Sequence, residues 1–308
     1  MKKIFLLDND LMGFFPKEMM NEYFYNIYSE NRIKKFLIRL FNKVGLLPRL
    51  FLFNHKWVRQ LKNNDAIVIF DGDSINKVAE SILKKFPTKK IIVWYWNPIS
   101  KAALLPKELD ERINSVWTYD SYDSKKYKIN LNSQFYFKEL VPINSEKHMM
   151  KRDVFFVGAD KGREKELKKL GNIFTEENIK FYFHLTKLWN SEKQSDSYSA
   201  PLSYPEVILN IIESKAILDL VGDKRQEGMS LRPLESLFLK KKLITNNIFI
   251  KKEKMYDPNN VFILGVDDLH QLKDFLRKDY LVQKSYDELI KYYDFREWSK
   301  RFEFKNKY

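Results

Sequence analysis

The feature that most constrains the fold is a repeated alternation of short, continuously apolar runs with helical patterns. In the first half the apolar runs cover residues 3–7, 65–70, 90–96 and 115–119, and each ends in a polar turn. Strands that are apolar on both faces are buried on both faces, which is typical of a parallel sheet covered by helices. The sequence therefore predicts the α/β class with a doubly wound sheet.

The same pattern restarts after a polar linker at residues 142–147. The apolar runs of the second half cover residues 153–157, 180–184, 216–221, 242–245 and 261–264, with helical patterns between them. A chain of 308 residues is long enough for two domains of about 150 residues each. We therefore expect two Rossmann-like, doubly wound domains, at residues 1–147 and 148–284, with ligands at the carboxyl ends of their strands or in the cleft between them.

Composition excludes several classes of protein. There is no cysteine, so a disulfide scaffold, a zinc–thiolate site, an iron–sulfur cluster and a cysteine nucleophile are ruled out. The apolar run at the N-terminus is interrupted by Asp8, Asn9 and Asp10, and the other apolar stretches contain Lys or Arg every few residues. We expect a cytoplasmic protein without a membrane-spanning segment.

The most informative stretch is residues 219–247. A buried strand ends near Val221, a polar loop with Gly228 permits close backbone approach, and Ser230 stands where a helix N-cap belongs. The helix N-terminus, with Arg232 beside it, is a ready site for a phosphate or diphosphate. Glu235 follows about one turn later, where its carboxylate could accept two hydroxyl groups of a ribose or another sugar.

Glu227 and Glu235 also form a Glu-x7-Glu element. Together with Gln226-x-Gly-Met-Ser-x-Arg-x-x-Glu235 and Lys242–Asn247, it resembles GT-B glycosyltransferases of capsule and lipopolysaccharide assembly, over about residues 150–265. The resemblance implies transfer of a sugar from a nucleotide-sugar donor to a saccharide acceptor, without an essential metal or another cofactor. It also implies two domains that face a central cleft, and a C-terminal helix at residues 285–308 that crosses back to the first domain.

The resemblance assigns roles to the matching residues. Glu235 would hold the ribose, and Ser230 and Arg232 would meet the diphosphate. Glu227 and Gly228 would face the donor sugar, with Glu227 a catalytic candidate. Lys161 and Arg163, in a Gly-containing turn between a strand and a helix, form a plausible anion site, and the resemblance implies that they neutralise the leaving diphosphate.

Two Asp-x-Asp strings follow strands, at Asp8 and Asp10 and at Asp71 and Asp73. In a GT-B enzyme, Asp8 or Asp10 would be the general base for the acceptor hydroxyl. Alternatives are a metal-dependent GT-A transferase, a haloacid-dehalogenase-like phosphatase with Asp8 as nucleophile, and a non-catalytic sugar-nucleotide-binding protein. The four histidines match no metal-ligand spacing, and no metal site is predicted.

The charge distribution is uneven: the chain carries +14, and residues 32–62 hold nine Lys or Arg and no Asp or Glu. No nucleic-acid-binding signature occurs, so nucleic acid is not an expected partner. Apolar residues at helical spacing from Ile33 to Val44 predict a cationic amphipathic helix. Either it lies on an anionic bilayer, at the inner face of the cytoplasmic membrane near a lipid-linked acceptor, or its apolar face packs on the first domain.

Overall fold

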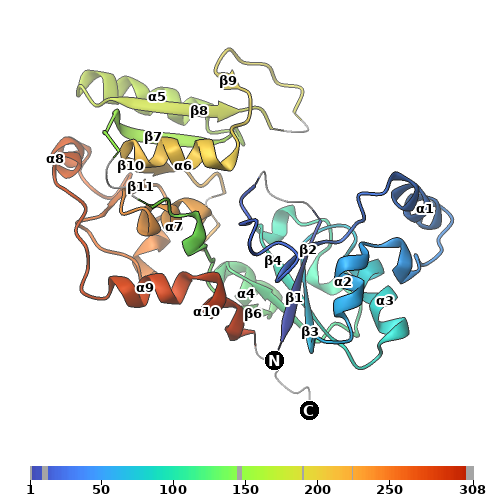
Figure 1. Ribbon diagram of the computed structural model, residues 1–308. Helices are drawn as coiled ribbons and strands as arrows, with labels where there is room; N and C mark the ends of the chain where they lie inside the picture. The colour runs from blue at the N-terminus through green and yellow to red at the C-terminus, as the bar shows by residue number, and fades with distance from the viewer. Residues whose placement is uncertain (1, 9–12, 144–147, 189–190, 224, 303–308) are drawn as a thin grey trace. The chain divides into compact units, whose positions relative to one another are not determined.

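The computed structural model describes residues 2–8, 13–143, 148–188, 191–223 and 225–302. The chain divides into two compact units. Unit 1 is Met1–Asn132 with Phe302–Tyr308, and unit 2 is Ser133–Arg301. Each unit has its own six-stranded sheet in which every neighbouring pair of strands is parallel (Figure 1). The predicted α/β class and the two Rossmann-like domains are therefore confirmed.

The sheet of unit 1 has the order β2-β1-β3-β4-β5-β6, so the strand order reverses between β1 and β3. The strands are β1 (Lys3–Leu7), β2 (Phe24–Asn26), β3 (Ala66–Phe70), β4 (Lys90–Tyr95), β5 (Ser115–Thr118) and β6 (Asn130–Leu131). The helices are α1 (Arg32–Lys43), α2 (His55–Gln60), α3 (Ile75–Lys85) and α4 (Ser121–Tyr127). Every residue of β3 is buried, as its continuously apolar sequence predicts.

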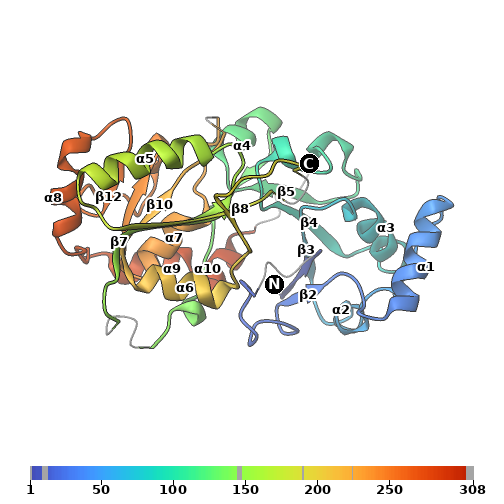
Figure 2. The same cartoon turned by 90° about the horizontal axis from the view of Figure 1, so that it is seen from above.

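The sheet of unit 2 has the order β12-β11-β10-β7-β8-β9, which reverses between β7 and β10. The strands are β7 (Arg152–Ala159), β8 (Phe181–Thr186), β9 (Tyr198–Ser199), β10 (Ser214–Asp219), β11 (Lys242–Thr245) and β12 (Val261–Ile263). The helices are α5 (Glu164–Glu176), α6 (Tyr204–Ile212), α7 (Leu231–Phe238), α8 (Leu272–Arg277), α9 (Tyr286–Tyr293) and α10 (Phe295–Trp298). Figure 2 shows α5 on one face of this sheet and α6 and α7 on the other.

The units divide before the polar linker that the sequence suggested as a boundary. An aromatic segment that precedes the linker belongs to unit 2. Its Phe135 ring lies 4.1 Å from Trp298 between centroids, and Tyr136 exchanges backbone hydrogen bonds of 2.9 Å with Tyr293 and Phe295. These contacts, rather than the polarity of the linker, set where unit 2 begins.

The C-terminal segment, expected as one helix at residues 285–308, is interrupted. Asp294 ends α9 and caps α10, its side chain accepting a hydrogen bond from the Arg296 N–H. A 3₁₀ turn at Ser299–Arg301 follows, and the next residue, Phe302, is buried in unit 1. No helix in the described part of the chain is both long and apolar enough to cross a bilayer.

Candidate functional site

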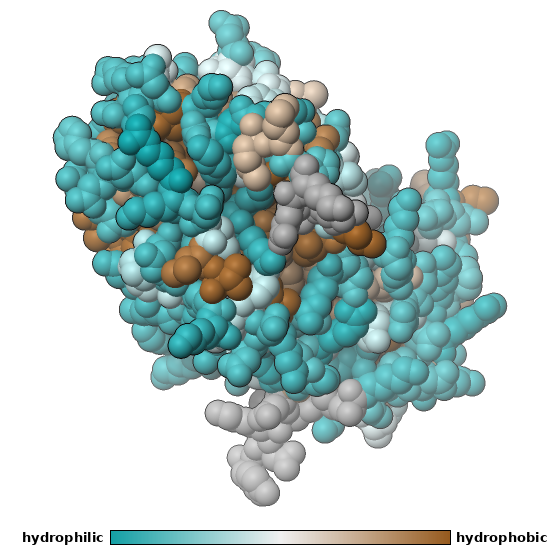
Figure 3. Space-filling model, turned by 60° about the vertical axis from the view of Figure 1, so that its left-hand side comes forward, coloured by the Kyte–Doolittle hydropathy of each residue, from teal (hydrophilic) through white to brown (hydrophobic). Residues whose placement is uncertain are grey.

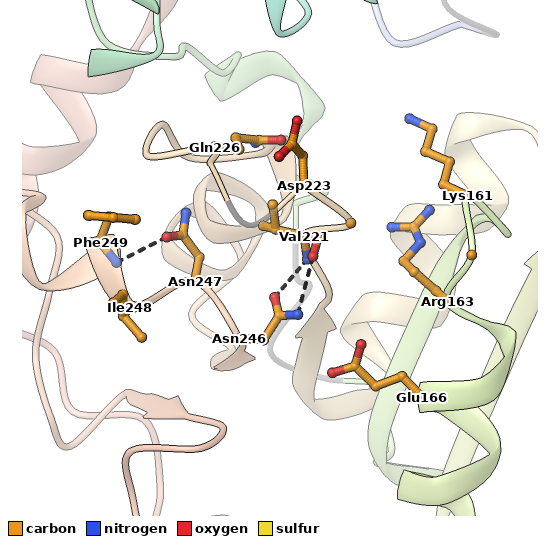
Figure 4. Close-up of a pocket in the computed structure, with 12 residues that line it drawn as sticks. Lys161, Arg163, Glu166, Val221, Asp223, Gln226, Asn246, Asn247, Ile248 and Phe249 are labelled. Carbon is orange, nitrogen blue, oxygen red and sulfur yellow. Dashed lines mark hydrogen bonds between the residues drawn. The ribbon is translucent and has the colours of Figure 1, made fainter. Parts of the chain in front are cut away.

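The carboxyl edge of the unit 2 sheet forms a pocket where the strand order reverses. The turn after β7, the loop after β10 and the turn after β11 meet around a volume of about 490 Å³ (Figure 4). In open α/β sheets such a reversal leaves a crevice, because neighbouring connections leave the sheet in opposite directions. The pocket is lined by Lys161, Gly162, Arg163, Glu166, Val221, Gly222, Asp223, Gln226, Asn246, Asn247, Ile248 and Phe249.

The two basic residues that line the pocket, Lys161 and Arg163, lie on the same side of it. Figure 4 shows the side chains of Lys161 and Arg163 on one side, both from the turn between β7 and α5. Lys161 and Gly162 adopt left-handed conformations, with φ of 42° and 86°. A glycine accepts such a conformation without strain, which accounts for Gly162 at this position. The turn therefore brings two cationic side chains to one wall of the pocket.

Arg163 also joins the ends of two strands. Its Nε donates to the carbonyl of Ala159 at 3.1 Å, its Nη2 donates to the same carbonyl, and its Nη1 donates to the carbonyl of Leu220 at 3.0 Å. A methyl group on Gly158 would lie 2.9 Å from Nη2, so the glycine makes room for the guanidinium. Burial lowers the pKa of Arg163, opposed by the nearby charge of Asp219, and arginine remains protonated.

The opposite wall is amide and apolar. Asn246 binds both backbone groups of Val221, accepting from its N–H at 2.7 Å and donating to its carbonyl at 3.2 Å. Asn247 accepts from the Phe249 N–H at 3.0 Å, and Figure 4 shows these bonds with Ile248 and Phe249 beside them. The two amides hold the loops in place, while Ile248 and Phe249 offer apolar and aromatic surface. Lys161 and Arg163 can meet an anionic part of a ligand and the apolar wall a flat part, while Glu166 and Asp223 add negative charge elsewhere in the lining.

Ser230 is the N-cap of α7, as its position in the sequence predicts. Its hydroxyl accepts from the Arg232 N–H at 3.2 Å and donates to Asp219 at 2.7 Å. The other carboxylate oxygen of Asp219 accepts from the Thr245 hydroxyl at 2.9 Å. Burial raises the pKa of Asp219, and these two hydrogen bonds oppose the rise. Ser230 therefore fixes the start of α7 against the ends of β10 and β11.

Glu235 is buried inside unit 2 rather than exposed at the surface of the pocket. It is 0% exposed; one carboxylate oxygen is paired with Arg232 and the other accepts from the Tyr204 hydroxyl at 2.9 Å. Tyr204 in turn is hydrogen-bonded to Tyr136 at 2.8 Å. In this structure both carboxylate oxygens accept from protein groups and the side chain is buried, so the ribose contact of Glu235 stays a prediction from the sequence.

The predicted donor residues therefore divide into two groups. Lys161 and Arg163 line the pocket, whereas Gly228, Ser230, Arg232 and Glu235 are not among its lining residues. Gly228 is buried, with its carbonyl accepting from Gln226 at 3.2 Å, and Glu227 is half-buried in the same loop. The sequence analysis did not assign Asn246, Asn247 and Phe249 to the site, although all three follow a buried strand and the first two belong to the stretch that carries the family resemblance.

The carboxyl edge of unit 1 carries a cluster of carboxylates at its own order reversal. Asp8 follows β1 and Asp71 follows β3, and a methyl group on Gly72 would lie 2.7 Å from Asp8 Oδ2. Asp71 accepts from the Trp96 N–H at 2.8 Å. Burial raises the pKa of Asp8, and the charges of Asp73 and Asp71 raise it further. Asp10, the other predicted base, lies outside the described residues.

Within the described ranges, no group of three or more His, Asp or Glu side chains is arranged to hold a metal ion. That the reaction needs no metal stays a prediction from the sequence.

No protein-family model and no curated protein matches the chain. Among solved structures, it is similar to the apo form of the lipopolysaccharide outer core galactosyltransferase WaaB, with 14% identity, 90% of this chain and 82% of that chain covered, and a TM-score of 0.46. It is also similar to HepE from Anabaena in complex with UDP, with 10% identity, 98% and 96% covered, and a TM-score of 0.42.

A third similar structure is a putative UDP-N-acetylglucosamine 2-epimerase from Listeria monocytogenes, with 9% identity, 94% and 90% covered, and a TM-score of 0.43. Glycosyltransferases recur among the similar structures. The identities and TM-scores are low, so these likenesses carry no conclusion about the site.

Proposed function

We propose that the protein is a glycosyltransferase that moves a sugar from a nucleotide-sugar donor to a saccharide acceptor in the assembly of a cell-surface polysaccharide or lipopolysaccharide. The observation that carries the proposal is the unit 2 pocket, with Lys161 and Arg163 on one wall and Ile248 and Phe249 on the other. The cations suit a diphosphate, and the apolar wall suits a base or sugar ring.

In the proposed reaction the acceptor oxygen forms a bond to the anomeric carbon of the donor. The bond from that carbon to the phosphate oxygen breaks, and the nucleoside diphosphate leaves with the electron pair. Lys161 and Arg163 stabilise the negative charge that develops on the diphosphate, which is the role that a metal plays in metal-dependent transferases. The hydroxyl proton goes to the carboxylate of Asp8, whose raised pKa makes it a better base than an ordinary aspartate.

The donor site is tested by thermal shift with a nucleoside, its monophosphate and its diphosphate, with and without Mg²⁺. The diphosphate is expected to stabilise the protein most, with no need for the metal. Lys161→Ala should weaken diphosphate binding by about 1.5–3 kcal/mol, the range for a hydrogen bond to a charged group. Lys165→Ala is the matched control, because Lys165 is an exposed lysine nearby on α5 that does not line the pocket.

The donor-site proposal fails if no nucleotide stabilises the protein, or if the two lysine variants bind the diphosphate equally. Magnesium-dependent hydrolysis of a phosphate ester that is lost in Asp8→Asn would instead support the phosphatase alternative.

We further propose that residues 32–62 attach the protein to the inner face of the cytoplasmic membrane, where a lipid-linked acceptor would be found. Support comes from the way α1 divides its apolar residues. Ile38 is buried and Leu37 and Phe41 pack against the core of unit 1, but Ile33 is 69% and Phe36 62% exposed. Further exposed apolar residues follow along the chain: Leu40, Val44, Leu46 and Phe51.

The inner face of α1 packs on the first domain, and the proposed membrane contact would use the outer face. An outward apolar row flanked by Lys and Arg, with no acidic residue in the segment, matches an anionic bilayer in both hydrophobicity and charge. Figure 3 shows a largely hydrophilic face with scattered hydrophobic patches. Each basic residue near an anionic surface contributes about 1 kcal/mol.

Membrane attachment is tested by sedimentation with vesicles of anionic and of neutral lipid. The wild type should sediment with anionic vesicles at low salt and be released as salt rises. Phe36→Ser with Leu40→Ser should abolish this without changing diphosphate binding, and so should replacement of Lys35, Arg39 and Lys43 by Gln. Leu281→Ser with Val282→Ser, an exposed apolar pair in unit 2, is the control. A wild type that ignores anionic vesicles at low salt overturns the idea.

A further inference from the structure

The carboxyl edge of unit 2 contains a second arginine, Arg232, that a buried carboxylate holds in place. Its Nη1 is paired with Glu235, and its Nη2 donates to the carbonyl of Val157, near the end of β7, at 3.2 Å. The Arg232 side chain remains 21% exposed, whereas Glu235 is 0% exposed. Arg232 is not among the residues that line the pocket, so it would meet the part of a ligand that extends beyond that lining, whereas Glu235 is fully buried.

We infer that Glu235 is a positioning residue, which together with Tyr204 aims Arg232 at the diphosphate of the donor, and that Glu235 does not itself bind the ribose. The inference rests on the proposed function, because it assumes a nucleotide donor in unit 2. It differs from the role that the Glu-x7-Glu resemblance implies for the same glutamate.

The energetics of burial support this division of roles. An ionised carboxylate removed from water is costly unless its oxygens are hydrogen-bonded or paired with a cation. Here one oxygen has the guanidinium of Arg232 and the other has the Tyr204 hydroxyl. Because Glu235 is 0% exposed, a sugar hydroxyl could reach its carboxylate only if the side chains packed around it moved apart.

The partners of Glu235 come from separate elements, so its orientation is set by the packing of unit 2. Tyr204 begins α6, and Tyr136 lies in the aromatic segment before the 3₁₀ turn at Lys138–Leu140. The ring of Tyr136 packs on Phe238 of α7, with 4.9 Å between centroids. Burial raises the pKa of both tyrosines well above its usual value, so their hydroxyls stay protonated and can donate.

The local charges explain why Arg232 needs such support. Arg163 and Arg232 repel each other, and the buried Asp219 attracts both. Glu235 is the carboxylate that attracts Arg232 most strongly, so without it the repulsion from Arg163 would be less well compensated. Because an arginine has five N–H groups, the bonds to Glu235 and Val157 leave donors for phosphate oxygens.

The test compares the binding of a nucleoside with that of its diphosphate in Glu235→Gln and Tyr204→Phe. If Glu235 positions Arg232, each variant should lose about tenfold in diphosphate affinity and little in nucleoside affinity. The double variant should lose less than the product of the two single losses, because both act through one carboxylate. Tyr286→Phe is the control: it removes a hydroxyl bonded to the Leu237 carbonyl of α7, away from Arg232.

The outcomes separate this inference from the donor-site proposal. If the wild type binds the diphosphate and Glu235→Gln weakens nucleoside and diphosphate by the same factor, Glu235 holds the ribose and the inference is overturned alone. If the wild type binds no nucleotide, both the inference about Glu235 and the donor-site proposal are contradicted. If Glu235→Gln does not fold, Tyr204→Phe is used for the test, because it keeps the ring and removes only the hydroxyl. Equal diphosphate affinity of Tyr204→Phe and the wild type also overturns the inference.

Discussion

Asp8 is the residue at which stability and the proposed activity oppose each other. Burial and the neighbouring carboxylates Asp73 and Asp71 raise its pKa above the value it has in an unfolded chain. A carboxyl group with a raised pKa in the folded state is disfavoured there as a carboxylate, so its charge costs stability once the pH is above both values. A base for an acceptor hydroxyl needs that same charge. The electrostatically unfavourable charge of Asp8 is therefore the charge that the proposed chemistry would require.

The first prediction concerns Asp8→Asn. Removing the charge should make unit 1 more stable at pH 7, while the sugar-transfer rate falls by about 10²–10⁴, the usual contribution of a general base. The stability difference should vanish below about pH 4, where the carboxyl group is protonated in both states. Urea unfolding at several pH values and a transfer assay measure the two effects. A variant that is less stable than the wild type at pH 7 would contradict this account.

At the scale of elements, the start of α5 is tied to the loop before β9. Asp160 accepts a hydrogen bond from the N–H of Glu164, the first residue of α5, at 2.9 Å, and it also accepts from Lys193 at 2.8 Å and from Tyr198 at 2.7 Å. Burial alone would raise the pKa of Asp160, but the hydrogen bonds from Lys193 and Tyr198 outweigh it and lower the pKa to about 2. The loop is thus fixed next to the turn that carries Lys161.

The second prediction follows from that lowered pKa. Because the folded-state pKa is below the unfolded one, the stabilising effect is complete above about pH 4 and is lost as the pH falls towards 2. Asp160→Asn should therefore be less stable than the wild type at pH 7, and the difference should shrink between pH 4 and 2. Unfolding free energies across that range measure it. Asp274→Asn, in an exposed ion pair with Arg277, is the control and should change little.

At the scale of the whole molecule, the chain returns to unit 1 at its C-terminal end. Phe302 is buried there against three aromatic rings, with centroids 6.4 Å from Phe5, 5.9 Å from Trp94 and 5.2 Å from Trp117. The core of unit 1 is therefore completed by a residue that follows all of unit 2 in the sequence. Unit 1 cannot close that part of its core until residue 302 has been made.

The third prediction is that Phe302→Ala destabilises unit 1 by about 3–5 kcal/mol, the cost of emptying a buried phenylalanine site. Trp94 and Trp117 belong to the same cluster, so tryptophan fluorescence during urea unfolding reports the loss directly. Leu281→Ala, at a half-exposed leucine of unit 2, should leave the transition almost unchanged. Equal unfolding midpoints for the two variants would show that Phe302 does not support the core.

The sequence by itself determined the strands that are apolar throughout, the polar turns at their carboxyl ends and the N-cap at Ser230. These features depend on neighbours a few residues away, so periodicity and local hydrogen bonding reveal them. The short strands β2, β6 and β9 escaped prediction, because each contains a polar residue and none lies in a continuous apolar run, whereas the equally short β12 is apolar throughout and was predicted.

Only the tertiary structure decided which side chains meet. One of the two partners of Glu235 is Tyr204, 31 residues away, and Tyr204 is hydrogen-bonded to Tyr136, 68 residues away. Local pattern places Glu235 one turn inside a helix, but whether that carboxylate faces a ligand or a buried arginine depends on how α6 and α7 pack on the same sheet. A side chain's chemical role is fixed by the dielectric and the partners around it, and those come from parts of the chain that no local pattern connects.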